Sequence, residues 1–160
     1  MEPVHEGRCA CGAVKYTAKG APMFVHCCHC SYCQRQSGAA FALNAMIEAD
    51  RVEVTQGTPE PVKVPSPSGK GQVIWRCPDC KTALWSHYGG AGDLIDFIRV
   101  GTLEDPSAMP PDIHIYTSTK QPWVTLDDGK PQVDEFYDRR EYWPAESLDR
   151  LKAVIAKAKG

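Results

Sequence analysis

Residues 27–33 read Cys27-Cys28-His29-Cys30-Ser31-Tyr32-Cys33, and this stretch decides how the rest of the chain is interpreted. Four of the eight cysteines of the 160-residue chain lie within it. The other four form two pairs, in the segments Cys9-Ala10-Cys11 and Cys77-Pro78-Asp79-Cys80, so no cysteine stands alone. Because thiolates at such short spacings close chelate rings on zinc, the cysteines predict metal binding.

The two separated pairs predict one closed site. Alternate residues of an extended segment point to the same side, so Cys9 and Cys11 project together. The Pro-Asp sequence between Cys77 and Cys80 favours a tight turn that resembles a zinc knuckle. Four thiolates complete a tetrahedral zinc, and a closed tetrahedral site is structural.

The central stretch predicts a second, open site. Cys28 and Cys30 share one side of an extended segment, and Cys33 folds back after the turn. Three thiolates leave the fourth position free, which is typical of a catalytic or ligand-binding zinc. Cys27 and His29 should point the other way, so His29 is predicted not to be a ligand. Cys27 is read as a small buried residue, with a spare ligand or a redox partner as the alternative.

A rival division pairs Cys30 and Cys33 with Cys77 and Cys80, as in a zinc ribbon. Residues 34–76 between these pairs are far more than the usual ribbon spacing of about 15–20 residues. The rival division also leaves Cys9 and Cys11 without partners. The spacing therefore favours the first division.

The remaining sequence predicts a mainly β fold. Residues 1–8 show no pattern of a helix or strand. Residues Gln34 to Gln36 favour a short helix that ends at Gly38. Residues 127–130 have the composition of a hairpin-type turn. Apolar residues at every third or fourth position predict an amphipathic helix at about 145–158, whose apolar stripe packs on the core or forms an oligomer contact. Short alternating or apolar stretches between Gly/Pro turns predict strands at 13–18, 23–25, 41–47, 52–55, 62–64, 72–76, 83–88, 94–100 and 113–116.

Composition excludes several classes of protein. The length fits one domain over residues 1–160. The chain has 18 basic and 20 acidic residues and no basic stripe, which argues against binding to nucleic acid. No apolar run approaches the roughly 20 residues of a membrane span, and the N-terminus shows no signal peptide. We therefore expect a cytoplasmic protein, whose thiols stay reduced.

The cysteine pattern resembles the glutathione-dependent formaldehyde-activating enzyme family, which also includes centromere protein V. The pattern is C-x-C, then C-H-C-x-x-C, then C-P-x-C, within a similarity over roughly residues 5–137. Further matching segments are Gly7–Gly12, Gln34–Gly38, Val100–Leu103, Asp105-Pro106, Pro111–Ile115, Ser118–Lys120 and Trp123.

This resemblance implies an Mss4-like fold of antiparallel β-sheets that carry zinc. It implies two zinc ions per chain, a structural one on Cys9, Cys11, Cys77 and Cys80 and a second on Cys28, Cys30 and Cys33, which are also the catalytic residues. It further implies carbon–sulfur lyase chemistry on a glutathione adduct of formaldehyde.

The carboxylates of glutathione need cationic or amide partners near the second zinc. Arg35 and Gln34 are the nearest candidates after Cys33, although a solvent-facing role for Arg35 is the competing interpretation. A non-catalytic zinc-stabilised module that binds a protein is the alternative function, because fold alone does not decide activity. His114 and the four tryptophans are interpreted as structural residues.

Overall fold

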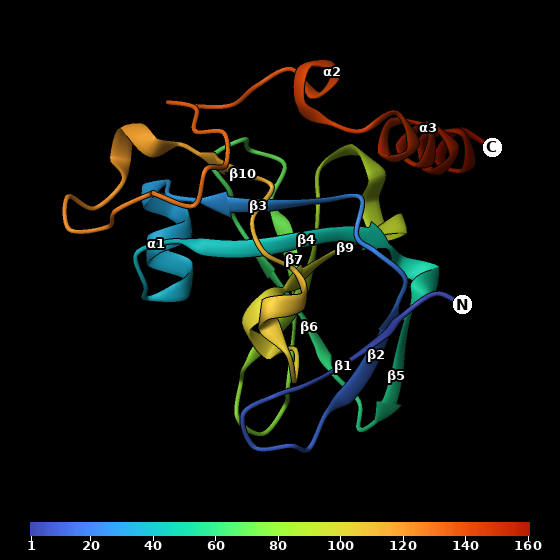
Figure 1. Ribbon diagram of the computed structural model, residues 1–160. Helices are drawn as coiled ribbons and strands as arrows, with labels where there is room; N and C mark the ends of the chain where they lie inside the picture. Colours follow the sequence, from blue (N-terminus) through green and yellow to red (C-terminus); the bar gives the residue numbers. More distant parts are fainter.

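In the computed structural model, which describes all residues from Met1 to Gly160, ten strands form two sheets (Figure 1). The small sheet has the order β1-β2-β5, and the large one has the order β10-β3-β4-β9-β8-β7-β6. Neighbouring strands are antiparallel except β10, which pairs with β3 in parallel. The strands are Val4–Arg8 (β1), Lys15–Lys19 (β2), Phe24–Cys28 (β3), Ala42–Glu48 (β4), Val52–Gln56 (β5), Glu60–Val64 (β6), Gln72–Arg76 (β7), Ala83–Tyr88 (β8), Ile95–Arg99 (β9) and Ile113–Ile115 (β10).

One face of the large sheet packs against the small sheet. Successive side chains of a strand point to opposite faces, so Val25, Ala45 and Ile98 all reach this side. Tyr16 of β2 meets Trp85 of β8 edge to face, with ring centroids 5.3 Å apart. This first core joins the two sheets.

The opposite face of the large sheet is covered by the C-terminal part of the chain. Phe24 and Met46, the neighbours of Val25 and Ala45, point to this side and belong to a second buried cluster. The ring of Phe24 stacks on Trp143, with centroids 5.3 Å apart. Leu151 of the terminal helix completes the cover, so the part of the large sheet around β3 is buried on both faces.

Three α-helices accompany the sheets: Ser31–Ser37 (α1), Arg139–Tyr142 (α2) and Ala145–Lys159 (α3). Helix α1 lies at one end of β3 and β4, and α3 lies toward the other end, near both termini (Figure 1). Gly38 ends α1 in the left-handed conformation, at a φ of 68°. Short 3₁₀ segments occupy Ala49–Arg51, Gly89–Leu94, Val100–Thr102, Pro106–Ala108 and Thr117–Thr119, and the second of them is interrupted at Gly92.

The predicted mainly β class, the short helix after the central cysteines and the C-terminal helix are confirmed. The expectation of no element in residues 1–8 was wrong, because this segment forms β1. Val4 is the one large apolar residue of β1 and gives no alternation, and the place of the strand in the sheet depends on Gly7. A Cβ atom on Gly7 would lie 2.4 Å from the ring of Tyr16, so only glycine lets the strand approach. Helix α2 and the parallel pairing of β10 were also not predicted.

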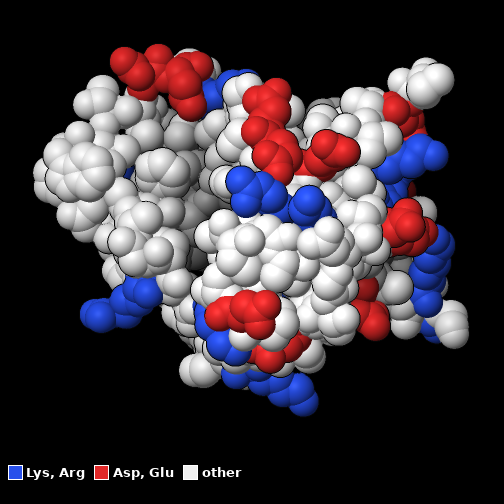
Figure 2. Space-filling view, turned by 90° about the horizontal axis from the view of Figure 1, so that it is seen from below, with Lys and Arg blue, Asp and Glu red and all other residues white.

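The surface carries charges of both signs. Figure 2 shows one face, where basic and acidic side chains are interspersed and no broad basic area appears. No helix has the length and apolarity that crossing a bilayer requires. Several charges are paired, as in Arg150, which donates to Glu48 at 2.5–2.8 Å and joins α3 to β4.

We predict that Leu151→Ala lowers the free energy of unfolding by about 2–4 kcal/mol, because it leaves a cavity under α3. Ile155→Ala is the matched control on the same helix, since Ile155 is 39% exposed and Leu151 only 8%. Urea unfolding followed by tryptophan fluorescence measures both variants. Equal effects would mean that α3 does not depend on this apolar stripe.

Candidate metal centres

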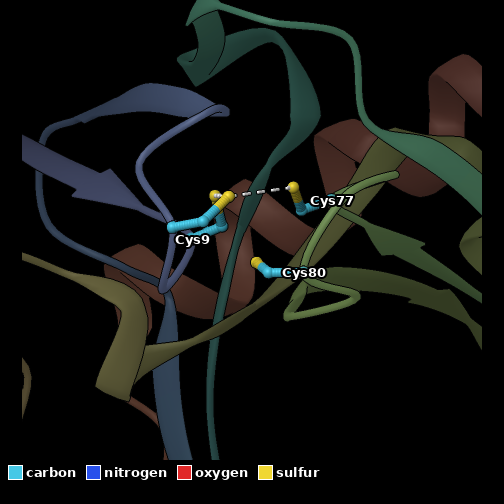
Figure 3. Close-up of side chains that lie close together, drawn as sticks. Cys9, Cys77 and Cys80 are labelled. Carbon is cyan, nitrogen blue, oxygen red and sulfur yellow. Dashed lines mark hydrogen bonds between the residues drawn. The ribbon is translucent and has the colours of Figure 1, made fainter.

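Two hairpin loops bring the first group of cysteines together. Cys9 and Cys11 lie in the loop between β1 and β2, and Cys77 and Cys80 lie in the loop between β7 and β8. The sulfurs of Cys9, Cys77 and Cys80 point into the same space between these loops (Figure 3). The group therefore connects the small sheet to the large one.

The sulfur spacing of this group fits one tetrahedral ion. The Sγ of Cys11 lies 3.7 Å from that of Cys9 and 3.8 Å from that of Cys77. Four sulfurs at about 2.3 Å from a zinc ion would stand about 3.8 Å apart. The group could thus hold a metal ion with little rearrangement.

Hydrogen bonds stabilise thiolates in the first group. The backbone N–H of Val14 donates to the Sγ of Cys9 at 3.3 Å. The hydroxyl of Thr82 lies 3.1 Å from the Sγ of Cys80, and the pKa of Cys80 falls to about 5 because Thr82 donates to it. The same hydroxyl accepts the N–H of Ala10 at 3.2 Å and links the two loops. Thr82 was not predicted as part of this group, although its place two residues after Cys80 was a usable signal.

The second group is assembled where β3 passes into α1. Cys28 is the last residue of β3, Cys30 is the N-cap of α1, and Cys33 lies in the first turn of this helix. Their sulfurs lie within 4.8 Å of one another. No fourth Cys, His, Asp or Glu side chain completes the group.

The surroundings of Cys30 favour the thiolate form of its side chain. The backbone N–H of Cys33 donates to its sulfur at 3.2 Å, as in a helix cap. Hydrogen bonds from the thiols of Cys28 and Cys33 lower the pKa of Cys30 to about 2. The pKa of Cys28 is raised, first by its hydrogen bond to Cys30, so this thiol is the proton donor of the pair.

Two residues that sequence analysis did not single out lie beside the second group. Burial lowers the pKa of Arg99, and the nearby charge of Cys33 opposes that shift. Arg99 donates to Asn44 at 2.6 Å, which fixes the cation on the large sheet. Burial raises the pKa of Tyr116, and the charges of Cys28 and Cys30 add to this shift. In the sequence, Arg99 could have been noticed only as a single cation at the end of an apolar strand.

The two predicted substrate contacts have different surroundings. Gln34 donates to the carbonyl oxygens of His29 and Thr119, at 2.9 and 3.0 Å, and its own oxygen accepts from Gln121 at 2.8 Å. Its amide is therefore engaged within the protein. Arg35 is exposed and forms no hydrogen bond or ion pair. Only Arg35 is free to meet a ligand in this conformation.

The structure brings together both predicted sets of cysteines and separates those of the rival ribbon. Cys77 and Cys80 meet Cys9 and Cys11, not Cys30 and Cys33. Cys27 and His29 point away from the second group, as alternation predicts, and lie together with His114. This third association was not predicted, because His114 is distant in sequence.

A sequence model described as glutathione-dependent formaldehyde-activating enzyme matches residues 4–119 of the chain. The chain belongs to this family. A curated protein of Halomonas elongata that is named for the same enzyme is 24% identical over 127 residues, which cover 76% of this chain and 80% of the relative. A crystal structure of a Rhodobacter sphaeroides protein covers 80% of this chain and 99% of its own, with 18% identity and a TM-score of 0.46.

The family is described by the glutathione-dependent activation of formaldehyde, and this description applies to the family as a whole. The matched residues include both predicted cysteine groups, and they end at Thr119, before the C-terminal helices. The helices α2 and α3 therefore lie outside the matched part, although they cover one face of the large sheet.

We predict that Cys80→Ser lowers the melting temperature far more than Cys33→Ser. With a metal ion bound, the first group would close a loop of 66 residues between Cys11 and Cys77, and a cross-link over such a loop stabilises by about 4 kcal/mol. That loss corresponds to about 10 °C for a chain of this size. The second group spans only residues 28–33 and closes no long loop. Thermal unfolding by circular dichroism decides this, and equal shifts would contradict the assignment.

Proposed function

We propose that this protein is a zinc-dependent carbon–sulfur lyase that forms or breaks S-hydroxymethylglutathione. The observation that carries the proposal is the second group, in which three sulfurs converge and no fourth protein ligand completes the set. Cys30 and Cys33 are partly exposed, so a ligand from solvent can reach this position. An open position is the mark of a catalytic zinc site.

The donor set favours a thiol as the ligand. Three thiolates around Zn²⁺ leave a formal local charge of about −1, which makes the ion a weak Lewis acid toward a carbonyl group. When bound, zinc would supply one thing: it would keep the thiol of glutathione deprotonated at neutral pH. In the same proposal, a second zinc on Cys9, Cys11, Cys77 and Cys80 has a structural role.

The chemical step needs a place for one proton. The thiolate sulfur donates its electron pair to the carbonyl carbon of formaldehyde, and the C=O π pair moves to oxygen, which takes up a proton. In the reverse direction the hydroxyl loses its proton and the C–S bond breaks. Tyr116 lies beside Cys28 and Cys30, and burial keeps its phenol protonated, so it supports a role as proton donor.

Tyr116 is held in an unusual backbone conformation, with a φ of 54°. A non-glycine residue in this region costs about 1–3 kcal/mol and persists where surrounding structure fixes it. Its N–H donates to the carbonyl of Glu135 at 2.8 Å, which ties it to the C-terminal segment. We assign to the cation of Arg99, which interacts with the charge of Cys33, the role of offsetting the negative charge of the thiolates.

The carboxylates of glutathione would meet Arg35, the exposed cation of α1. The side-chain amide of Gln34 is hydrogen-bonded to His29, Thr119 and Gln121. We therefore propose that Gln34 holds α1 against the segment that follows Tyr116. We also propose a cytoplasmic location, where the eight cysteines would stay reduced and able to bind metal.

We predict that Cys30→Ser abolishes catalysed exchange between formaldehyde and S-hydroxymethylglutathione. Exchange spectroscopy by NMR measures this rate with and without protein, because the spontaneous reaction must be subtracted. Ser31→Ala is the control, since Ser31 is exposed and lies next to Cys30 without a hydrogen bond from its side chain. A wild-type rate equal to the spontaneous rate would reject the lyase and leave the protein-binding module as the better function.

We predict that Arg35→Gln raises the KM for glutathione about tenfold and changes kcat little, because it removes an ion pair made equally in the ground and transition states. Lys15→Gln removes the same charge from β2 and should leave KM unchanged. The same NMR assay at several glutathione concentrations gives both constants. An unchanged KM for Arg35→Gln would assign Arg35 to the solvent-facing surface.

A further inference from the structure

Cys27, His29 and His114 form a third cluster on the opposite face of β3 from the second group. Their ligand atoms lie within 4.8 Å of one another. The Nε2 of His29 is 3.5 Å from the Sγ of Cys27 and 3.1 Å from the Nδ1 of His114. All three residues are buried, with exposed fractions of 2%, 0% and 4%. One thiol and two imidazole nitrogens thus meet at a single point.

The spacing of these atoms fits one tetrahedral ion. With Zn–N distances of about 2.0–2.1 Å and a Zn–S distance of about 2.3 Å, two nitrogens stand about 3.3 Å apart and a nitrogen and a sulfur about 3.6 Å apart. The observed 3.1 and 3.5 Å are close to both values.

Asp128 fixes the tautomer of His114 that metal binding requires. The Nε2 of His114 lies 2.8 Å from the Oδ2 of Asp128, and a carboxylate accepts the proton of this nitrogen. The lone pair of Nδ1 then faces His29 and Cys27. Histidines that bind metals commonly donate their other ring N–H to a carboxylate, as His114 does here.

Hydrogen bonds within the protein do not satisfy this cluster. If the Nε2 of His29 donates to the Nδ1 of His114, the thiol proton of Cys27 has no acceptor. The Nδ1 of His29 is buried with no partner whether or not an ion is bound, so the case for an ion depends on the atoms that face one another. An ion that replaces the thiol proton of Cys27 and the Nε2 proton of His29 would use all three facing lone pairs. The ring proton of His29 would then sit on Nδ1; the centroid of this ring lies 5.3 Å from that of Phe41.

Charge balance allows an ion at this depth. A buried charge is costly unless it is compensated. A divalent cation would be neutralised by two negative charges, the thiolate of Cys27 and the carboxylate of Asp128. The carboxylate acts through its hydrogen bond with His114. The second group differs in this respect, because three thiolates exceed the charge of its ion.

We propose that Cys27, His29 and His114 bind a third zinc ion, with Asp128 as the positioning residue of His114. The donor set of one sulfur and two imidazoles suits zinc among the divalent ions. The proposal stands independently of the lyase activity, since none of the three ligands belongs to the second group.

The third zinc would fasten a long segment to β3. The N–H of His29 donates to Ile115 at 3.0 Å, and the carbonyl of the same residue accepts from Gln34 and Thr119. Asp128 lies in the loop that follows these contacts. One ion would therefore hold β3, β10 and the loop at Asp128 beside the entrance to α1.

Zinc counting on protein saturated with Zn²⁺ and then desalted tests the proposal. We expect three zinc ions per wild-type chain and two for His114→Gln. His87→Gln is the matched control, because His87 also pairs with a carboxylate, that of Asp96 at 2.7 Å, and belongs to no group of cysteines. It should retain three ions. Two ions in the wild type, with no loss in His114→Gln, would overturn the proposal.

X-ray absorption at the zinc edge provides a test on the unmodified protein, should His114→Gln fail to fold. The first and second groups contain only cysteines, so imidazole scattering can arise only from the third cluster. We expect the outer-shell signature of two imidazoles in the wild-type spectrum. A spectrum with sulfur and oxygen donors and no imidazole signature would overturn the assignment.

Discussion

The structure depends on the burial of β3 on both of its faces. This strand lies between β10 and β4, and all five of its residues are buried. Its alternate side chains must therefore satisfy two different environments. Val25 faces the core shared with the small sheet, whereas Phe24 faces the core under α3. The same alternation continues through Cys27 to Cys30 and sends neighbouring donor atoms to opposite sides.

A single short segment can thus contribute to two chemically different sites. On one side, Cys28 and Cys30 meet Cys33 of α1, two of them partly exposed, and as three thiolates they would exceed the charge of a divalent ion. On the other side, Cys27 and His29 meet His114, fully buried, with charges that balance a divalent ion. The side of the strand, and not the distance in sequence, determines which residues act together.

Sequence patterns predicted those parts of the molecule that local rules determine. The strands from β2 to β9 alternate or are apolar, α3 has an amphipathic repeat, and the turn before Cys80 follows from Pro78 and Asp79. The two cysteine sets were predicted because short spacings limit which sulfurs can meet. Strand β1 was missed because its position depends on the contact between Gly7 and the ring of Tyr16, which no local pattern records.

The third cluster shows where such rules end. His114 was read correctly as a hydrogen-bonded residue of a strand, but its partners depend on the parallel pairing of β10 with β3. That register places His114 opposite Cys27, and the loop that follows returns Asp128 to its outer nitrogen. Alternation correctly predicted that His29 does not belong to the second group. The same alternation directs His29 toward Cys27 and His114. When a side chain is excluded from one site, the contacts of its donor atoms on the other side of the strand should therefore also be considered.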